Sequence, residues 1–399
     1  MLPKPPPRDQ SLGFLYLPPY RVIGHSVAGE TTTVQIPELD LTFDMGSCPR
    51  PMLASKFVAI SHGHMDHIGG LAYYCSQRNF QGMGPGTIIC PAELENPIHK
   101  MMAGFVDLER QKTPYNLIAI KNDEPVEIKN NIFITAFPLE HTGPTFGFSV
   151  HEKRSKLLAE YVGLPQEKLM ELKSRGTEIT RSMTIPICAY VMDTAPCPNL
   201  IREDVRKAQI LITECTFFEA DNKERAKSGM HMHVDELCQW LKVVECEHIV
   251  LGHISRRTNL MVARKEIGAK LGRDVTRRIE LLMDSKSNKE RYERQLLDAG
   301  EHPQQVGPGM RRPMGGDRGP APGGYSGGSQ SGGGHSGGGG QSSGGYSGPS
   351  PSTGQGGYSP RPGGYGPRPS YDSRSSRSGP GPGPRAPTAP TDDADENRP

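Results

Sequence analysis

The sequence lacks three features that would each place it in a distinct class of protein. It contains no run of 18 apolar residues, which excludes an ordinary membrane-spanning helix. Its proline-rich first residues lack the apolar segment of a secretory leader, and none of its eight cysteines stands in a CxxC pair. We therefore expect reduced, mostly buried thiols in a cytoplasmic protein that has no membrane partner.

An excess of charge of one sign is lacking as well. The chain carries 46 lysines and arginines against 44 acidic residues, and nine of the arginines and seven of the acidic residues follow Gly300. The first 300 residues are therefore neutral, with 37 charges of each sign. A general nucleic-acid binder would show a basic excess. Binding of a polyanion to this part of the chain would have to depend on a local patch or on bound metal ions.

Residues 301–399 differ in composition from the rest of the chain. They are dominated by glycine, serine and proline, and they contain no lysine. Such a segment buries too little apolar surface to offset the entropy cost of ordering it. We expect one folded domain at residues 1–300 and a disordered tail at residues 301–399. The tyrosines and arginines scattered through the tail suit two interpretations, an RNA-contacting segment or a solubilising linker.

Short apolar runs bounded by glycine, proline or polar residues predict β-strands in the first 300 residues. In the first half they lie at 20–23, 31–36, 41–43, 57–60, 87–89, 117–120 and 132–137, with helices at 69–77 and 92–105. In the second half, strands at 185–192, 209–213 and 248–251 alternate with helices at 234–244, 262–271 and 286–297, and residues 153–176 resemble a charged helical excursion. Two such halves indicate an α/β protein, a four-layer αββα sandwich.

One run of ligand-type side chains differs from the other, scattered histidines. His62, His64, Asp66 and His67 fall within six residues, directly after the strand expected at 57–60. Alternate residues of an extended strand end project to the same side, so His62 and His64 would face one metal ion. Asp66 and His67, at the start of a helix, would then face a second ion from another direction.

A site for two metal ions needs further ligands, including one that both ions share. Candidates follow three of the expected strands, namely His141, Asp193 and His253. The predicted ligand sets are His62, His64, His141 and Asp193 for one ion, and Asp66, His67, His253 and Asp193 for the other. Imidazole and carboxylate ligands without thiolate indicate two Zn²⁺ ions, with Mn²⁺ or Fe as alternatives.

Through these ligands the sequence resembles the metallo-β-lactamase superfamily. Four further stretches are similar to tRNase Z, a family of tRNA 3′-processing endoribonucleases, and most of all to its short plant-type members. They begin at Phe43 (FDMGSCP), Tyr161 (YVGLP, with LKSRGTEI further on), Glu214 (ECTF) and His253 (HISRR). The resemblance covers residues 20–284 and implies the αββα metallo-β-lactamase fold.

The resemblance also implies an activity, that of a zinc-dependent endoribonuclease that removes 3′ trailers from tRNA precursors by hydrolysing a phosphodiester. Its catalytic residues would be Asp66, Glu214 and His233. Glu214 would orient His233, and His233 would protonate the leaving oxygen. His231 competes with His233 for that role.

Substrate binding and assembly are implied in the same way. Arg257 matches the arginine of the family's His-Phe-Ser-x-Arg motif and would hold a substrate phosphate. Arg256 beside it is an alternative that the sequence alone does not separate. The substrate would be an RNA, and the family's members commonly form homodimers.

Two other classes of protein remain open. A hydrolase of the same fold that acts on another phosphodiester, or on a thioester or amide, would share the His62–His67 run. It would not be expected to carry the series from Glu214 to Arg257. A non-catalytic RNA-binding protein would be expected to have lost several of the proposed ligands, whereas all of them are present.

Overall fold

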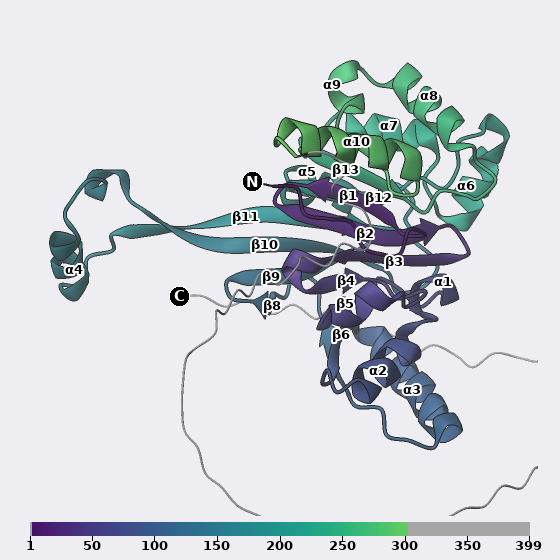
Figure 1. Ribbon diagram of the computed structural model, residues 1–399, viewed down its shortest axis with the longest axis horizontal. Coiled ribbons are helices and arrows are strands. Elements are labelled where there is room, and N and C mark those ends of the chain that lie inside the picture. The colour runs from purple at the N-terminus through teal and green to yellow at the C-terminus, as the bar shows by residue number, and fades with distance from the viewer. Residues whose placement is uncertain (1, 302–399) are drawn as a thin grey trace, which may run out of the picture. The chain divides into compact units, whose positions relative to one another are not determined.

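Two seven-stranded β-sheets lie face to face in the computed structural model of the protein, with helices on their outer sides (Figure 1). The structure describes residues 2–301. All of them belong to the first of the two units into which contacts divide the chain, Met1–Gly315 and Gly316–Pro399. The tail that we predict at residues 301–399 lies outside the described residues, apart from Glu301.

The first sheet is formed by strands that follow one another in chain order. These are β1 (Gly13–Leu17), β2 (Tyr20–Val27), β3 (Thr31–Ile36), β4 (Leu41–Phe43), β5 (Phe57–Ala59), β6 (Gly86–Pro91) and β7 (Tyr115–Ile120). The pairs from β1 to β4 are antiparallel, and the pairs from β4 to β7 are parallel. Parallel pairing needs crossover connections, and those after β5 and β6 contain helices.

The second sheet repeats this pattern. Its strands are β8 (Val126–Lys129), β9 (Ile132–Pro138), β10 (Phe146–Leu157), β11 (Thr180–Val191), β12 (Ile210–Glu214), β13 (His248–Gly252) and β14 (Ile279–Leu281). The pairs from β8 to β11 are antiparallel, and the pairs from β11 to β14 are parallel. Of all these strands, the sequence did not predict β1, β8, β10 and β14.

The α-helices fall into two sets on opposite sides of the sheets (Figure 1). The first set is α1 (Met65–Ile68), α2 (Leu71–Phe80) and α3 (Glu95–Glu109). The second set is α5 (Glu203–Arg206), α6 (Lys223–Gly229), α7 (Val234–Leu241), α8 (Leu260–Lys270), α9 (Arg273–Thr276) and α10 (Ser285–Asp298). Short 3₁₀ turns are η1 (Pro37–Leu39), η2 (Arg50–Ala54), η3 (Ala92–Leu94), η4 (Ala159–Tyr161), η5 (Pro198–Ile201) and η6 (Ala220–Asn222).

Three large groups of buried apolar side chains hold the layers together. The inner group lies between the sheets and includes Phe43 from the first and Tyr190 from the second, whose rings stack at 4.5 Å. One outer group packs α2 and α3 on the first sheet through residues such as Ile98. The other packs α7 and α8 on the second sheet through residues such as Trp240 and Ile267. This arrangement confirms the predicted αββα sandwich.

A two-stranded ribbon extends away from the second sheet and forms an arm (Figure 1). β10 and β11 stay paired out to Leu157 and Thr180, and η4 and α4 (Gln166–Ser174) lie at the tip. We define the arm as residues 152–185, none of which is buried. The expectation of a helical excursion at 153–176 is therefore wrong in its first part. Residues 153–157 continue β10 because they pair with β11.

The cysteines agree with the expectation of buried thiols. All eight are free, and only Cys48 and Cys197 are not fully buried. Among residues 2–301, no helix is both long and apolar enough to cross a membrane.

Candidate metal centre

The predicted metal ligands come from the ends of strands in both sheets. His62 and His64 follow β5, Asp193 follows β11, and His253 follows β13. Each of these strands has a parallel neighbour, and each ligand stands at its carboxyl end. His141 lies in the turn between β9 and β10. Sheets with parallel strands characteristically place ligand sites outside these carboxyl ends.

The structure brings together the first predicted group of ligands. His62, His64, His141 and Asp193 each offer one ligand atom within 4.8 Å of the others. The ring centroids of His62 and His64 are 4.6 Å apart, and those of His64 and His141 are 4.9 Å apart. Oδ2 of Asp193 lies 3.7 Å from Nε2 of His62 and 3.9 Å from Nε2 of His141.

The second predicted group meets beside the first. Ligand atoms of Asp66, His67 and His253 also lie within 4.8 Å of one another. Oδ2 of Asp66 is 3.6 Å from Nε2 of His67 and 3.5 Å from Nε2 of His253. Oδ2 of Asp193 is 3.3 Å from each of the same two nitrogens. One oxygen of Asp193 therefore lies close to ligand atoms of both groups, as a shared ligand would.

The turn that carries Asp66 and His67 is held against the chain that follows β4. Met45 donates its backbone N–H to the carbonyl oxygen of His67 and accepts from the N–H of Gly70, both at 2.7 Å. A Cβ atom on Gly46 would lie 1.9 Å from the carbonyl oxygen of Asp66. Only glycine allows the two segments to approach this closely.

Three residues of the centre have a left-handed backbone. Asp44, Asp193 and His253 have φ values of 54°, 46° and 49°. Such a conformation costs a non-glycine residue about 1–3 kcal/mol and is concentrated at functional sites. Asp44 and His253 directly follow a strand end, and Asp193 lies two residues after one, so the left-handed residue breaks the extended backbone where a side chain enters the centre.

Two buried polar atoms of the centre have no hydrogen-bond partner among the described residues. They are Nε2 of His62 and Oδ1 of Asp193. An unpaired polar atom away from water is costly, and it is rare in folded proteins. A cation bound by imidazole and carboxylate groups would satisfy both atoms, so this set of residues fits a metal ion.

The protonation of the centre also indicates a need for positive charge. Burial lowers the pKa of His62 to about 2, which leaves its ring neutral and able to bind a metal. Burial would raise the pKa of Asp193, but the charges of His253 and His67 hold it well below its usual value. Burial would lower the pKa of His67, yet the charges of Asp193 and Asp44 raise it well above its usual value. A proton on His67 thus supplies charge that a cation would otherwise provide.

A fully buried carboxylate, Asp44, orients histidines of both groups. Its Oδ2 accepts from Nδ1–H of His67 at 2.8 Å and from the hydroxyl of Ser61 at 2.9 Å. The Ser61 hydroxyl has one hydrogen, which goes to Asp44, so Ser61 Oγ accepts from Nδ1–H of His62 at 3.0 Å. Both Nε2 atoms are left free for a metal. The sequence signal for Asp44 was its place directly after the strand expected at 41–43.

Glu214, the last residue of β12, orients histidines from the second sheet and is also fully buried. Its Oε1 accepts from Nδ1–H of His231 at 3.1 Å, and its Oε2 accepts from the hydroxyl of Thr216 at 2.5 Å. Oγ1 of Thr216 lies 3.0 Å from Nδ1 of His253 and accepts from it, because its only hydrogen goes to Glu214. Sequence reasoning did not find Thr216.

His231 therefore takes the place predicted for His233. Its ring centroid lies 4.8 Å from that of His141 and 5.2 Å from that of His253. Burial lowers the pKa of His231, but its hydrogen bond to Glu214 and the charge of Glu214 raise it more, so the net pKa lies above the usual value.

The predicted pairing of Glu214 with His233 is wrong. His233 is the N-cap of α7, where its Nδ1 accepts from the backbone N–H of Asp235 at 3.2 Å. Its Nε2–H donates to the carbonyl oxygen of Glu219 at 3.1 Å. The residue is directed to the helix end because both of its ring nitrogens are used there. Glu236 completes a capping box with it, a signal that the sequence contained.

The two candidate arginines lie after His253 on an exposed turn. Arg256 forms an ion pair with Glu30 at 2.9 Å. Arg257 forms no ion pair with another described residue, so its guanidinium is available to an anion.

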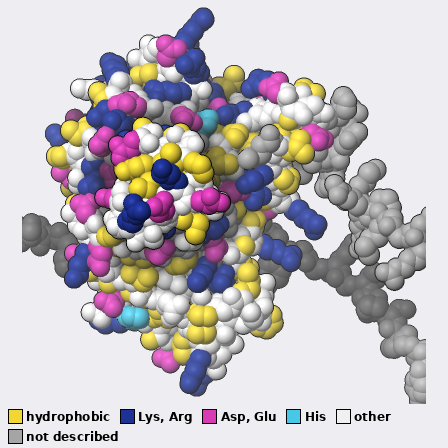
Figure 2. Space-filling view, turned by 90° about the vertical axis from the view of Figure 1, so that its left-hand side faces the viewer, with side chains coloured by type: hydrophobic (Ala, Val, Ile, Leu, Met, Phe, Trp, Pro, Cys, Tyr) yellow, Lys and Arg dark blue, Asp and Glu magenta, His cyan; other side chains and the backbone are white. Residues whose placement is uncertain are grey.

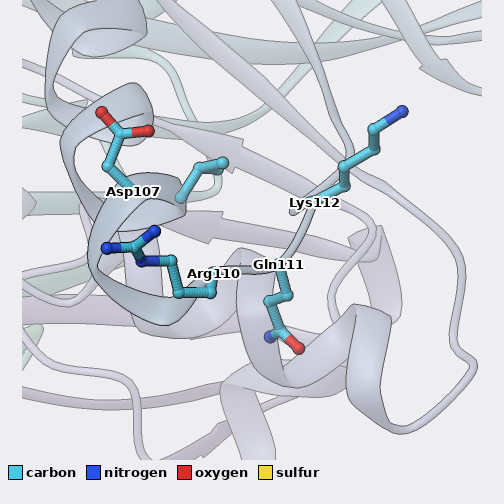
Figure 3. Close-up of a pocket in the computed structure, with 5 residues that line it drawn as sticks. Asp107, Arg110, Gln111 and Lys112 are labelled. Carbon is cyan, nitrogen blue, oxygen red and sulfur yellow. The ribbon is translucent and has the colours of Figure 1, made fainter.

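A hollow in the surface lies elsewhere, at the C-terminal end of α3 (Figure 3). Its lining residues are Val106, Asp107, Arg110, Gln111 and Lys112. None of them is a histidine or cysteine, and none comes from an element that supplies the predicted ligands. The metal centre, not this hollow, is the candidate functional site.

Comparison with known proteins identifies the class that this fold and centre define. Residues 48–254 match the family model described as Beta-lactamase superfamily domain. The chain therefore belongs to the metallo-β-lactamase superfamily.

Individual relatives narrow the assignment. tRNase Z TRZ1 of Arabidopsis thaliana is 32% identical over 241 residues, which are 60% of this chain and 86% of the relative. The chloroplastic tRNase Z TRZ2 of the same plant is 30% identical over 62% of this chain and 71% of its own. A nuclear ribonuclease Z of Triticum aestivum is 34% identical over 41% of this chain and 94% of its own. The chain is a member of the tRNase Z, or ribonuclease Z, family.

We expect metal removal to destabilise the protein, because metal ions bind the folded centre and not the unfolded chain. Dialysis against EDTA should lower the melting temperature by roughly 5 °C or more at saturating metal. Differential scanning fluorimetry before and after Zn²⁺ is returned measures the change. A melting temperature that stays constant while elemental analysis shows that the metal has gone would contradict a metal site here.

Proposed function

We propose that this chain is a zinc-dependent endoribonuclease that hydrolyses a phosphodiester and removes 3′ trailers from tRNA precursors. The observation that carries the proposal is the Glu214–His231 pair, which lies beside two ligand groups that share Asp193. A metal pair beside a proton-carrying imidazole suits the cleavage of a phosphodiester with a poor leaving group. The names of the relatives, tRNase Z and ribonuclease Z, support tRNA as the substrate.

The proposed metal ligands are those expected from the sequence. His62, His64, His141 and Asp193 would hold one Zn²⁺, and Asp66, His67, His253 and Asp193 would hold the other. When bound, the two ions would make water a nucleophile near neutral pH and neutralise charge that develops on the phosphate. Asp66 is fixed for this task because its Oδ2 also accepts the backbone N–H of Gly29 at 3.0 Å.

His231 would act as the proton donor. Its Nδ1–H is directed to Glu214, so the second proton of the imidazolium form is carried on Nε2. A departing sugar oxygen takes up that proton as the bond to phosphorus breaks, and the buried charge of Glu214 stabilises the imidazolium before transfer. The products are a 3′-hydroxyl on the tRNA and a 5′-phosphate on the trailer.

Arg257 would bind a phosphate next to the scissile one. Its side chain is exposed and lies four residues after His253, a proposed ligand. A guanidinium binds two phosphate oxygens at once, which a lysine cannot do. Arg256 is less suitable because Glu30 already neutralises it.

The direct test is to incubate the purified chain with tRNA precursors that carry 3′ trailers and to map the cut. We expect a single cut at the 3′ end of the tRNA, loss of cleavage in EDTA, and recovery with Zn²⁺. Parallel assays with bis(p-nitrophenyl) phosphate and a glutathione thioester separate the alternatives. Turnover of the thioester alone would contradict the proposal and favour a thioesterase of the same fold.

The two histidines near Glu214 give a matched pair of variants. His231→Ala should lower kcat for the precursor by about a hundredfold or more with little change in melting temperature, because a general acid is lost. His233→Ala should lower the free energy of unfolding by about 1 kcal/mol, because α7 loses its N-cap, and leave kcat within about threefold. Single-turnover cleavage and urea unfolding measure both. The opposite pattern would return the catalytic role to His233.

The arm provides a second surface for RNA. Over residues 152–185 it carries seven basic and five acidic side chains, in a domain that is neutral as a whole. Arg154 and Arg175 pair with acidic neighbours. The basic side chains of the arm that form no ion pair with a described residue and lie beyond its base are Lys156, Lys168, Lys173 and Arg181. Figure 2, which looks onto the side from which the arm projects, shows basic, acidic and apolar side chains interspersed, so any attraction for RNA is local.

Neutralising those four side chains tests the arm. With Lys156, Lys168, Lys173 and Arg181 replaced by glutamine, we expect KM for a precursor to rise by about tenfold and to depend less steeply on salt. Hydrolysis of bis(p-nitrophenyl) phosphate, which is too small to reach the arm, should change less than twofold. The control replaces Arg273 and Arg277, at the two ends of α9, and Lys286 and Lys289 of α10, and so removes the same charge elsewhere. Equal effects of both sets on KM would refute a role for the arm.

Four further proposals follow from the sequence and the family. Residues 1–300 would form the catalytic domain, and residues 301–399 a tail that either contacts RNA or keeps the protein soluble. The chain would form a homodimer and act in the cytoplasm. Light scattering of the full chain measures the dimer, and cell fractionation measures the location. Precursor affinity at two salt concentrations, with and without residues 301–399, separates the two roles of the tail.

A further inference from the structure

Asp44 accepts more hydrogen bonds than its contact with His67 alone would account for. Besides His67, its oxygens accept the backbone N–H of Ser61 at 2.7 Å, the Ser61 hydroxyl at 2.9 Å and the hydroxyl of Tyr190 at 2.6 Å. All of these groups are buried. Oδ2 accepts three of these four hydrogen bonds and Oδ1 accepts one, so the carboxylate cannot rotate without losing a bond.

Tyr190 reaches Asp44 from the opposite sheet. It lies on β11, whereas Asp44 follows β4. Its ring stacks on Phe43 with an interplanar angle of 5°, so packing fixes the direction of the hydroxyl. The same strand ends at Val191, and Asp193, the ligand shared by both groups, follows two residues later. One strand and the turn after it therefore carry both a group that anchors Asp44 and the shared ligand.

We propose that Tyr190 and Ser61 are positioning residues around Asp44 that set the binding of the two metal ions separately, Tyr190 through Asp44 and Ser61 through its own bond to His62. The proposal rests on the function proposed above, because it concerns the same metal centre. Tyr190 fixes the carboxylate that holds the ring of His67, and so acts on the ion that His67 binds. Ser61 is the direct partner of His62, and so acts mainly on the other ion.

The physical basis is the loss of rotational freedom in the ligands. A metal-binding imidazole is aimed by the partner of its second nitrogen, and changing such a partner typically weakens metal binding by about 10–100-fold. Without the Tyr190 hydroxyl, Asp44 keeps three donors but loses the one that comes from the second sheet. Without the Ser61 hydroxyl, His62 Nδ1 loses its only partner in the described structure.

The test uses variants that remove a hydroxyl and little else, Tyr190→Phe and Ser61→Ala. The chain contains matched controls, since Tyr16 and Ser149 are equally buried but their hydroxyls have no hydrogen-bond partner among the described residues. Tyr16→Phe and Ser149→Ala therefore remove the same atoms without touching Asp44. His64→Ala and His253→Ala, each lacking a ligand of one group only, identify which step of metal release belongs to which group.

Stepwise competition of each Zn²⁺-loaded full-length variant with a chromogenic chelator measures both affinities, and melting of the metal-free proteins measures stability. We expect Tyr190→Phe to lower the Zn²⁺ affinity of the His67 group by about tenfold. Ser61→Ala should lower the Zn²⁺ affinity of the His62 group by about 10–100-fold. The controls should match the wild type in both steps.

Unchanged affinities in both variants, with lower melting temperatures of the metal-free proteins, would overturn the proposal and leave a purely structural role. A lower Zn²⁺ affinity of the same group in both variants would overturn the proposal that the two residues control different ions. A wild-type protein that takes up no Zn²⁺ would overturn the proposed function as well, whereas wild-type uptake with unaffected variants overturns only the positioning roles.

Discussion

The centre depends on one constraint, which is that polar groups removed from water must find partners. Imidazole nitrogens of His62, His67 and His253 converge on one buried oxygen of Asp193. Two atoms there have no hydrogen bond, and the pKa of His67 is raised because the surrounding carboxylates attract a proton. Such a cluster is costly as it stands and favourable around a cation. The second nitrogen of each of these rings is already bound, which leaves the inward nitrogens for the metal.

Local patterns were enough to predict most of the fold and the ligand groups. Apolar runs indicated the central strands, and ligand-type residues directly after them marked the carboxyl ends where parallel strands place a site. The outer half of β10, in the arm, was missed because it has no apolar pattern and contains four exposed polar residues in a row. Pairing with β11, not side-chain burial, keeps that segment extended. The edge strands β1 and β14 do carry buried apolar residues, so their omission was a failure to use a signal that the sequence contained.

The role of the histidines near Glu214 depended on contacts that the sequence does not display. His231 and His233 are two residues apart, and either could have faced the centre. The structure separates them because helix α7 begins at Val234, so the ring of His233 accepts a backbone N–H of the first turn. The roles of the Ser61 and Thr216 hydroxyls could not be predicted from the sequence either. Serine and threonine are common in every kind of segment, and each of these two hydroxyls has a partner elsewhere in the sequence.

The two sheets share an arrangement of strands that explains where the two central aspartates lie. In each sheet the fourth strand, β4 or β11, has an antiparallel neighbour on one side and a parallel neighbour on the other. Asp44 follows β4 and Asp193 follows β11, both with a left-handed backbone. Equivalent positions thus carry the same residue in different roles. Four donors occupy Asp44, whereas Oδ1 of Asp193 has none. The supply of donors, more than the residue type or its place in the sheet, decides which aspartate orients histidines and which is left to bind metal.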